Sequence, residues 1–228
     1  MHTVRPAAVA GAFYPAQTSV LSGTVLALLA KAAANTESDA TAPKAIVVPH
    51  AGYIYSGATA ALAYAQLGSA RGRIRRVVLL GPVHRVAVRG LALPGAAAFA
   101  TPLGEIEIDL AAVAALAGMP QVIVSPAAHA QEHSLEVQLP FLQSVLDDFK
   151  LLPLAVGNAT PAEVAQVLER LWGGPETLIV ISSDHGENQG ELSVYGDHQT
   201  SDHITNRVPL IVRHPKGLGG RGRSAPAA

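Results

Sequence analysis

Three apolar runs of this chain end in side chains that can bind a metal ion. They read VVPH, ending at His50, LLGPVH, ending at His84, and VISSDH, ending at Asp184 and His185. Imidazoles combined with a carboxylate suit divalent iron or zinc, and also copper. In open α/β sheets, ligands bind outside the carboxyl ends of the strands, so side chains far apart in sequence can converge there. We therefore expect a mononuclear metal site with His50 and His84 as principal ligands. Its third ligand is left open between Asp184, Glu132 and His185.

A second candidate region is the stretch AHAQEHSLEVQLPFLQ, in which Glu132 and His133 stand just before an amphipathic run. These two side chains can face the same site, with His133 as an acid or base, and the helix start can bind an anion. A surface helix start, with His133 bonded to a carbonyl, is the alternative. His129, Glu132 and His133 also match the H-x-x-E-H pattern of inverted zinc proteases. Small residues before the helical spacing begins argue against that activity.

Two tyrosines, Tyr53 and Tyr55, follow His50 closely. Their phenols can donate to a bound oxygen or stack on an aromatic ligand, but packing under the loop explains them slightly better. Serine hydrolases and P-loop nucleotide enzymes are excluded, because the chain has neither G-x-S-x-G nor G-x-x-x-x-G-K-[ST].

Composition indicates a globular protein with no charge bias. The chain has 228 residues, 49% of them hydrophobic, with 16 Lys plus Arg against 17 Asp plus Glu. Such a balance predicts neither nucleic acid nor an anionic membrane as a partner. There is no cysteine, so thiolate ligands and disulfides are excluded. No secretory or membrane-spanning segment is expected, which makes the cytoplasm the expected location.

Apolar runs and helical patterns alternate along the chain. Continuous runs of this kind are typical of strands buried on both faces, and the alternation predicts an α/β fold, a layered sheet with helices on both faces. The runs are residues 45–48, 77–80, 122–124, 151–156, 178–181 and 209–212. The helical patterns are residues 21–34, 58–67 after a hinge at Gly57, 110–116, 135–149, and 160–172 with a capping box between Thr160 and Glu163. Residues 35–43 are expected to form a polar loop, and residues 217–228 a disordered tail.

Six motifs in order resemble the Memo family, whose prokaryotic members are called AmmeMemoRadiSam system protein B. They are VRPAAVAGAFYP, VPHAGYIYSG, LGPVHR, TPLGEIEID, EHSLEVQLPFLQ and LIVISSD, spread over about residues 4–184. The resemblance implies a fold related to class III extradiol dioxygenases and a vestigial or active non-heme metal site. It makes His50 and His84 metal ligands, with Glu132, His133 and Asp184 lining the pocket. Metal-dependent redox chemistry and phosphopeptide binding have both been attributed to animal relatives.

After Asp184 the chain departs from that pattern. Residues 182–215, SDHGENQGELSVYGDHQTSDHITNRVPLIVRHP with its preceding serine, resemble the C-terminal metal-binding region of sulfatases, in which Asp184 and His185 would bind the cation. The expected organisation is a Memo-like domain over residues 1–184, with its C-terminal part truncated or replaced. A sulfatase-like fragment would follow over residues 185–216, adding one strand at 209–212. Sulfate ester hydrolysis is not expected, since the C/S-x-P-S-R nucleophile motif is missing.

These observations predict a Memo-like protein with a mononuclear non-heme site and metal-dependent redox or dioxygenase-like chemistry. Iron is the favoured ion, and copper or zinc are alternatives. The partner would be a small molecule or a peptide, and the oligomeric state is left open. The competing hypothesis is a module that binds a peptide or anion in the same cleft without catalysis.

Overall fold

The computed structural model describes residues 3–34 and 42–183. The expected sulfatase-like fragment, the strand at residues 209–212, the tail and most of the polar loop at residues 35–43 lie outside these ranges. In chain order the elements are β1 (Val4–Arg5), α1 (Thr18–Ala33), β2 (Ala45–Val48), α2 (Tyr53–Ala65), η1 (Gly68–Ala70), β3 (Arg76–Pro82), β4 (Leu91–Leu93), β5 (Ala98–Thr101), β6 (Gly104–Glu107), α3 (Leu110–Ala115), β7 (Val122–Val124), α4 (Pro126–Ala130), η2 (Glu136–Gln138), α5 (Leu139–Val145), β8 (Lys150–Val156), α6 (Pro161–Leu171) and β9 (Thr177–Ser182).

The main sheet has the strand order β2-β9-β3-β8-β4-β7. Its neighbours run parallel except β4 and β8, which are antiparallel. A second sheet, β1-β5-β6, carries the N-terminal strand. The α/β fold expected from the alternating pattern is confirmed.

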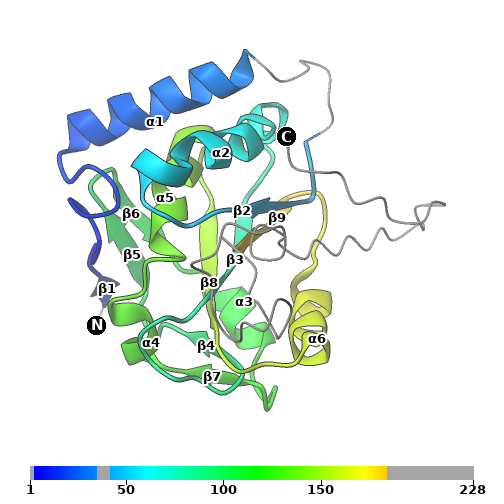
Figure 1. The fold of residues 1–228 in the computed structure, drawn as a ribbon. Coiled ribbons are helices and arrows are strands. Elements are labelled where there is room, and N and C mark those ends of the chain that lie inside the picture. The colour runs from blue at the N-terminus through cyan, green and yellow to red at the C-terminus, as the bar shows by residue number, and fades with distance from the viewer. Residues whose placement is uncertain (1–2, 35–41, 184–228) are drawn as a thin grey trace, which may run out of the picture. The chain divides into compact units, whose positions relative to one another are not determined.

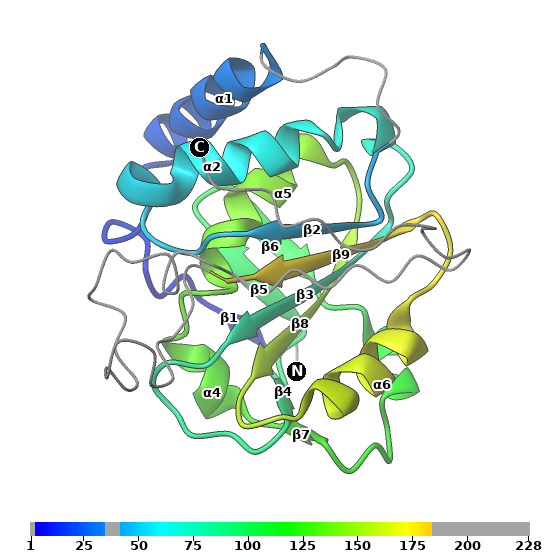
Figure 2. The ribbon, with the colours of Figure 1, turned by 45° about the vertical axis from the view of Figure 1, so that its right-hand side comes forward.

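Helices cover both faces of the main sheet, as the continuous apolar runs predicted (Figure 1). Val77 and Leu79 of β3 belong to one apolar core, with residues of α1, α2 and α5. Val78 and Leu80 point the other way and belong to a second core, with residues of α3 and α6. Figure 2 shows α1 and α2 on one side of the strands and α6 on the other.

The start of α6 follows the predicted capping box. The Thr160 side chain accepts from the main-chain N–H of Glu163, and the Glu163 carboxylate accepts from the N–H of Thr160. Pro161 occupies the first turn, where its missing N–H has no helical partner to lose. Within the described ranges, no helix is both long and apolar enough to cross a bilayer.

Two helix predictions were wrong at their boundaries. Helix α2 begins at Tyr53, and Gly57 lies inside it rather than at a hinge. A Cβ on Gly57 would lie 3.1 Å from Leu28, so the glycine allows α1 and α2 to pack closely. The pattern at residues 135–149 contains only η2 and the short helix α5, which ends where Leu146 becomes extended.

Four short strands, β1, β4, β5 and β6, were not predicted from the sequence. Their two to four residues are too few to show a period. The run at residues 122–124 does form β7, but it was wrong to expect burial on both faces. It is one of the two edge strands of the main sheet, and Ile123 and Val124 are exposed.

Candidate metal centre

His50, His84 and His133 gather in one cluster. One ring nitrogen from each lies within 4.8 Å of the other two. The ring centroids of His50 and His84 are 5.2 Å apart, and His133 lies 5.5 Å from His50 and 4.4 Å from His84. The expected convergence of His50 and His84 is confirmed, and such a cluster can bind a metal ion.

The sheet topology explains why His50 and His84 meet. Strands β2, β9 and β3 are adjacent and parallel, so their carboxyl ends lie at one edge of the sheet. His50 follows the end of β2 by two residues, and His84 follows the end of β3 by two. His50 is fully buried, whereas the side chains of His84 and His133 are 37% and 17% exposed. The cluster is therefore anchored inside and open on the side of His84.

Glu132 contacts two of the three imidazoles through their Nδ1 atoms. Its Oε1 lies 2.8 Å from Nδ1 of His84 and 3.3 Å from Nδ1 of His133. The same carboxylate accepts main-chain N–H groups from His84, His133 and Ser134 at 2.7 to 3.0 Å. A carboxylate accepts and does not donate, so the Nδ1–H of His84 donates to Glu132. This geometry directs Nε2 of the ring away from the carboxylate.

These donors keep the Glu132 carboxylate charged. Burial by itself would raise its pKa, but hydrogen bonds from the ring and N–H of His84 and from the N–H of Ser134 lower the pKa to about 2. Its oxygens are already engaged by these donors, so at neutral pH Glu132 is an ionised acceptor rather than a proton carrier.

His50 is held from the neighbouring strand end. Its Nδ1 lies 2.8 Å from Oγ of Ser182, the last residue of β9. Ser182 pairs with Val48 across the β2–β9 ladder, and this register places its hydroxyl beside the loop that carries His50. Ser182 was not predicted as a site residue, because a serine in the run VISSD has no distinguishing spacing.

A buried ion pair fixes the segment that supplies Glu132 and His133. The Arg5 guanidinium donates to the carbonyl of His129 at 2.9 and 3.0 Å and to that of Glu132 at 2.8 Å. It also pairs with Glu136, which accepts from the phenol of Tyr14. Arg5 and Glu136 are 6% and 0% exposed. Residue types gave no reason to pair two positions 131 residues apart.

His129 lies outside the cluster, which agrees with the rejection of a protease. Helix α4 ends at Ala130, so His129 and His133 do not share a helical face. Nε2 of His129 lies 2.8 Å from the carbonyl of Ala92, and burial lowers the ring's pKa to about 4.

The remaining predicted site residues fall into two groups. Asp184 and His185 lie outside the described residues. Tyr53 is buried and its phenol donates to the carbonyl of Val137 at 2.7 Å, so it packs under the loop. Tyr55 is 81% exposed.

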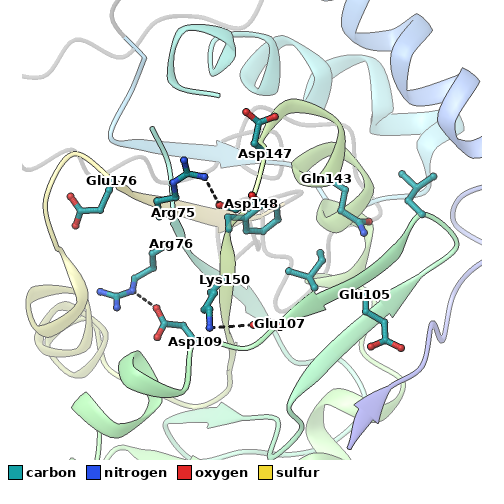
Figure 3. A pocket seen from close by; sticks show the side chains of 13 residues that line it. Arg75, Arg76, Glu105, Glu107, Asp109, Gln143, Asp147, Asp148, Lys150 and Glu176 are labelled. Carbon is teal, nitrogen blue, oxygen red and sulfur yellow. Dashed lines mark hydrogen bonds and ion pairs between the residues drawn. The ribbon is translucent and has the colours of Figure 1, made fainter. Parts of the chain in front are cut away.

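A cavity of about 920 Å³ lies near the amino ends of β3 and β8, not near the histidines (Figure 3). Carboxylates outnumber cations in its lining, and each of the three cations, Arg75, Arg76 and Lys150, already has a partner. Arg76 pairs with Asp109 at 2.6 Å, Lys150 with Glu107 at 3.2 Å, and Arg75 donates to the carbonyl of Asp148. Because these cations are already engaged, the cavity offers no preformed anion site.

Comparison with known proteins agrees with the motifs. A family model described as Memo-like protein matches residues 5–205. A MEMO1 family protein of Archaeoglobus fulgidus is 38% identical over 186 residues, covering 77% of this chain and 65% of the relative. One from Ignicoccus hospitalis is 35% identical over 239 residues, covering 96% of this chain and 83% of the relative. Protein MEMO1 of Danio rerio is 34% identical, covering 82% and 68%.

These alignments also bear on the C-terminal part. The chain spans slightly under two thirds of the length of the Archaeoglobus relative. The family match continues past residue 184, where the sequence reading expected the Memo-like part to end. The sulfatase-like fragment finds no support in these matches and stays a prediction.

Proposed function

This chain belongs to the Memo-like protein family, and on that premise we propose that His50, His84 and His133 bind one divalent metal ion for redox or dioxygenase-like chemistry. The observation that carries the proposal is the approach of three ring nitrogens to within 4.8 Å of one another. It is supported by the acceptors behind the rings, since metal-binding histidines usually donate their second N–H to the protein.

The cluster is wider than a site with an ion bound. With metal–nitrogen bonds of about 2.1 Å, the ligand atoms around one ion lie about 3 to 3.5 Å apart. The upper limit of 4.8 Å here exceeds that spacing by about 1.3 Å or more, so the rings have to move inward to complete the site. His84 and His133 are the partly exposed members, and a tilt of each ring about its contact with Glu132 brings its Nε2 closer to His50.

The donor set favours a borderline metal. Imidazole nitrogen suits iron, zinc and copper, and the absence of cysteine removes the thiolate that would favour softer ions. We propose iron, because the redox chemistry attributed to the family's animal members needs an ion that changes oxidation state. A bound ferrous ion would supply activation of O₂ or of a substrate oxygen.

Each residue then has a separate task. Fully buried His50 sets the depth of the site, and His84 and His133 form its solvent-facing side. Glu132 orients both outer rings and stays ionised. We assign His133 to the metal, which replaces the acid–base role expected for it. The relation to class III extradiol dioxygenases, a cytoplasmic location and ligation by Asp184 or His185 stay predictions.

An anaerobic titration of tag-free, metal-stripped protein with Fe²⁺, Zn²⁺ and Cu²⁺ tests the proposal. We expect one ion per chain, and loss of binding in the His50→Ala/His84→Ala double variant. A folded wild-type protein that binds no ion but still binds a phosphopeptide would overturn the proposal in favour of the binding module.

A further inference from the structure

Ser182 lies among three hydrogen-bonding groups at the end of β9. Its Oγ is 2.8 Å from Nδ1 of His50, 3.1 Å from the amide nitrogen of Gln138 and 3.1 Å from the carbonyl oxygen of Ser134. Ser182 is 4% exposed, so water competes little for these bonds. A hydroxyl has one hydrogen and can accept two. The direction of the other two bonds therefore determines where His50 carries its proton.

Gln138 has only one orientation that satisfies its neighbours. Its side-chain oxygen accepts the phenol hydrogen of Tyr64 at 2.9 Å, and its Nε2 donates to the carbonyl of Pro49 at 2.9 Å. A carbonyl cannot donate, so the nitrogen has to face Pro49. The second hydrogen of this amide then donates to Ser182 and takes one of its lone pairs.

The carbonyl of Ser134 fixes the remaining bonds. It can only accept, so it takes the single hydrogen of the Ser182 hydroxyl. One lone pair of Ser182 remains, and only a donor can use it. We infer that Ser182 is a positioning residue: it accepts Nδ1–H of His50, fixes that tautomer and selects Nε2 as the atom that binds the metal.

This selection gives His50 and His84 the same tautomer. Glu132 imposes the same tautomer on His84, and its Oε1 lies 3.3 Å from Nδ1 of His133. A protein acceptor behind each ligating ring sets the tautomer and the ring orientation. The part of the inference that concerns the metal rests on the proposed function, whereas the tautomer of His50 does not.

The tautomer can be measured without any variant. In ¹⁵N-labelled, metal-free protein at mildly alkaline pH, two-bond ¹⁵N–¹H correlations distinguish a protonated from an unprotonated ring nitrogen. We expect a protonated Nδ1 and an unprotonated Nε2 on His50. The opposite pattern would overturn the inference.

Variants separate the role of Ser182 in tautomer choice from a structural role. Ser182→Ala removes the acceptor, so we expect a mixture of His50 tautomers and about a 10- to 100-fold loss of metal affinity in competition with a chelator. Ser182→Thr keeps a hydroxyl and is expected to restore both. Thr177→Val is the matched control, because Thr177 is a buried hydroxyl at the other end of the same strand.

The outcomes are distinguishable. Unchanged tautomer and affinity in Ser182→Ala, or an equal affinity loss in Thr177→Val, would overturn the role of Ser182. The expected tautomer in a wild-type protein that binds no metal would overturn the proposed function and the choice of ligand atom, while the tautomer assignment stands.

Discussion

His84 and Glu132 are joined by two hydrogen bonds, one to each oxygen of the carboxylate. The ring Nδ1 lies 2.8 Å from Oε1, and the main-chain N–H of His84 donates to Oε2 at 2.7 Å. The pair therefore fixes both the backbone and the ring of one proposed ligand. Because the same carboxylate lies against His133, one side chain sets the relative position of two imidazoles.

Replacing Glu132 with glutamine should weaken metal binding more than it weakens the fold. An amide has one acceptor oxygen, so its NH₂ group would face a donor of His84. We expect about a 10- to 100-fold loss of metal affinity, measured by chelator competition. Glu163→Gln is the control, because Glu163 belongs to the capping box at the start of α6, which contacts none of the histidines. Wild-type affinity in Glu132→Gln would contradict the role assigned to this carboxylate.

His129 should make the fold sensitive to acid. Burial lowers its pKa from 6.5 to about 4, with a further contribution from the charge of Arg5, against the opposing effects of the Ala92 carbonyl and Glu132. The unfolded chain therefore binds the proton first, and stability falls as the pH drops from about 6.5 towards 4. In addition to burial, a protonated ring would place Nδ1–H where the described residues provide no acceptor.

The check is urea unfolding of wild type and His129→Gln across this pH range. Glutamine keeps a donor for the Ala92 carbonyl but does not titrate. We expect the variant to lack a pH-dependent loss on the order of 3 kcal/mol that the wild type shows. Parallel pH profiles of the two proteins would exclude His129 as the source.

Arg5→Met should destabilise the protein strongly. Glu136 would keep its buried charge but lose its cation, a change that costs about 3 to 5 kcal/mol. Arg5→Met combined with Glu136→Gln removes the isolated charge and should recover part of the loss. Equal unfolding free energies for Arg5→Met and the double variant would contradict the claim that the isolated charge of Glu136 causes the loss.

Gly81→Ala should push the segment that carries His133 away from β3, the strand that leads to His84. A Cβ on Gly81 would lie 2.8 Å from Oγ of Ser134 and 3.0 Å from Leu135, in the segment that carries His133. We expect a destabilisation of about 1 to 3 kcal/mol together with weaker metal binding. Gly23→Ala in α1 meets nothing within 4 Å and should be neutral or slightly stabilising. Unfolding and metal titrations of both variants decide the matter, and a Gly81→Ala protein as stable as Gly23→Ala would contradict this account.

The sequence predicted those features that depend on long patterns or on strand ends. The apolar runs predicted five strands of the main sheet, and the positions of His50 and His84 just after two strand ends predicted that they meet. The roles of Ser182 and Arg5 were not predicted. That of Ser182 depends on the register of β9 beside β2, and that of Arg5 depends on an ion pair with a residue 131 positions away. Gly57 was misread as a hinge, since close packing of two helices leaves no local signal.

The most direct test of the central claim is X-ray absorption spectroscopy at the edge of the bound metal. We expect a shell of nitrogen or oxygen neighbours at about 2.0 to 2.2 Å, with multiple scattering from three imidazoles, in the wild type. His133→Ala should lose one imidazole and keep the ion at lower affinity. A spectrum with fewer than three imidazoles in the wild type, or one unchanged by His133→Ala, would contradict a site built from His50, His84 and His133.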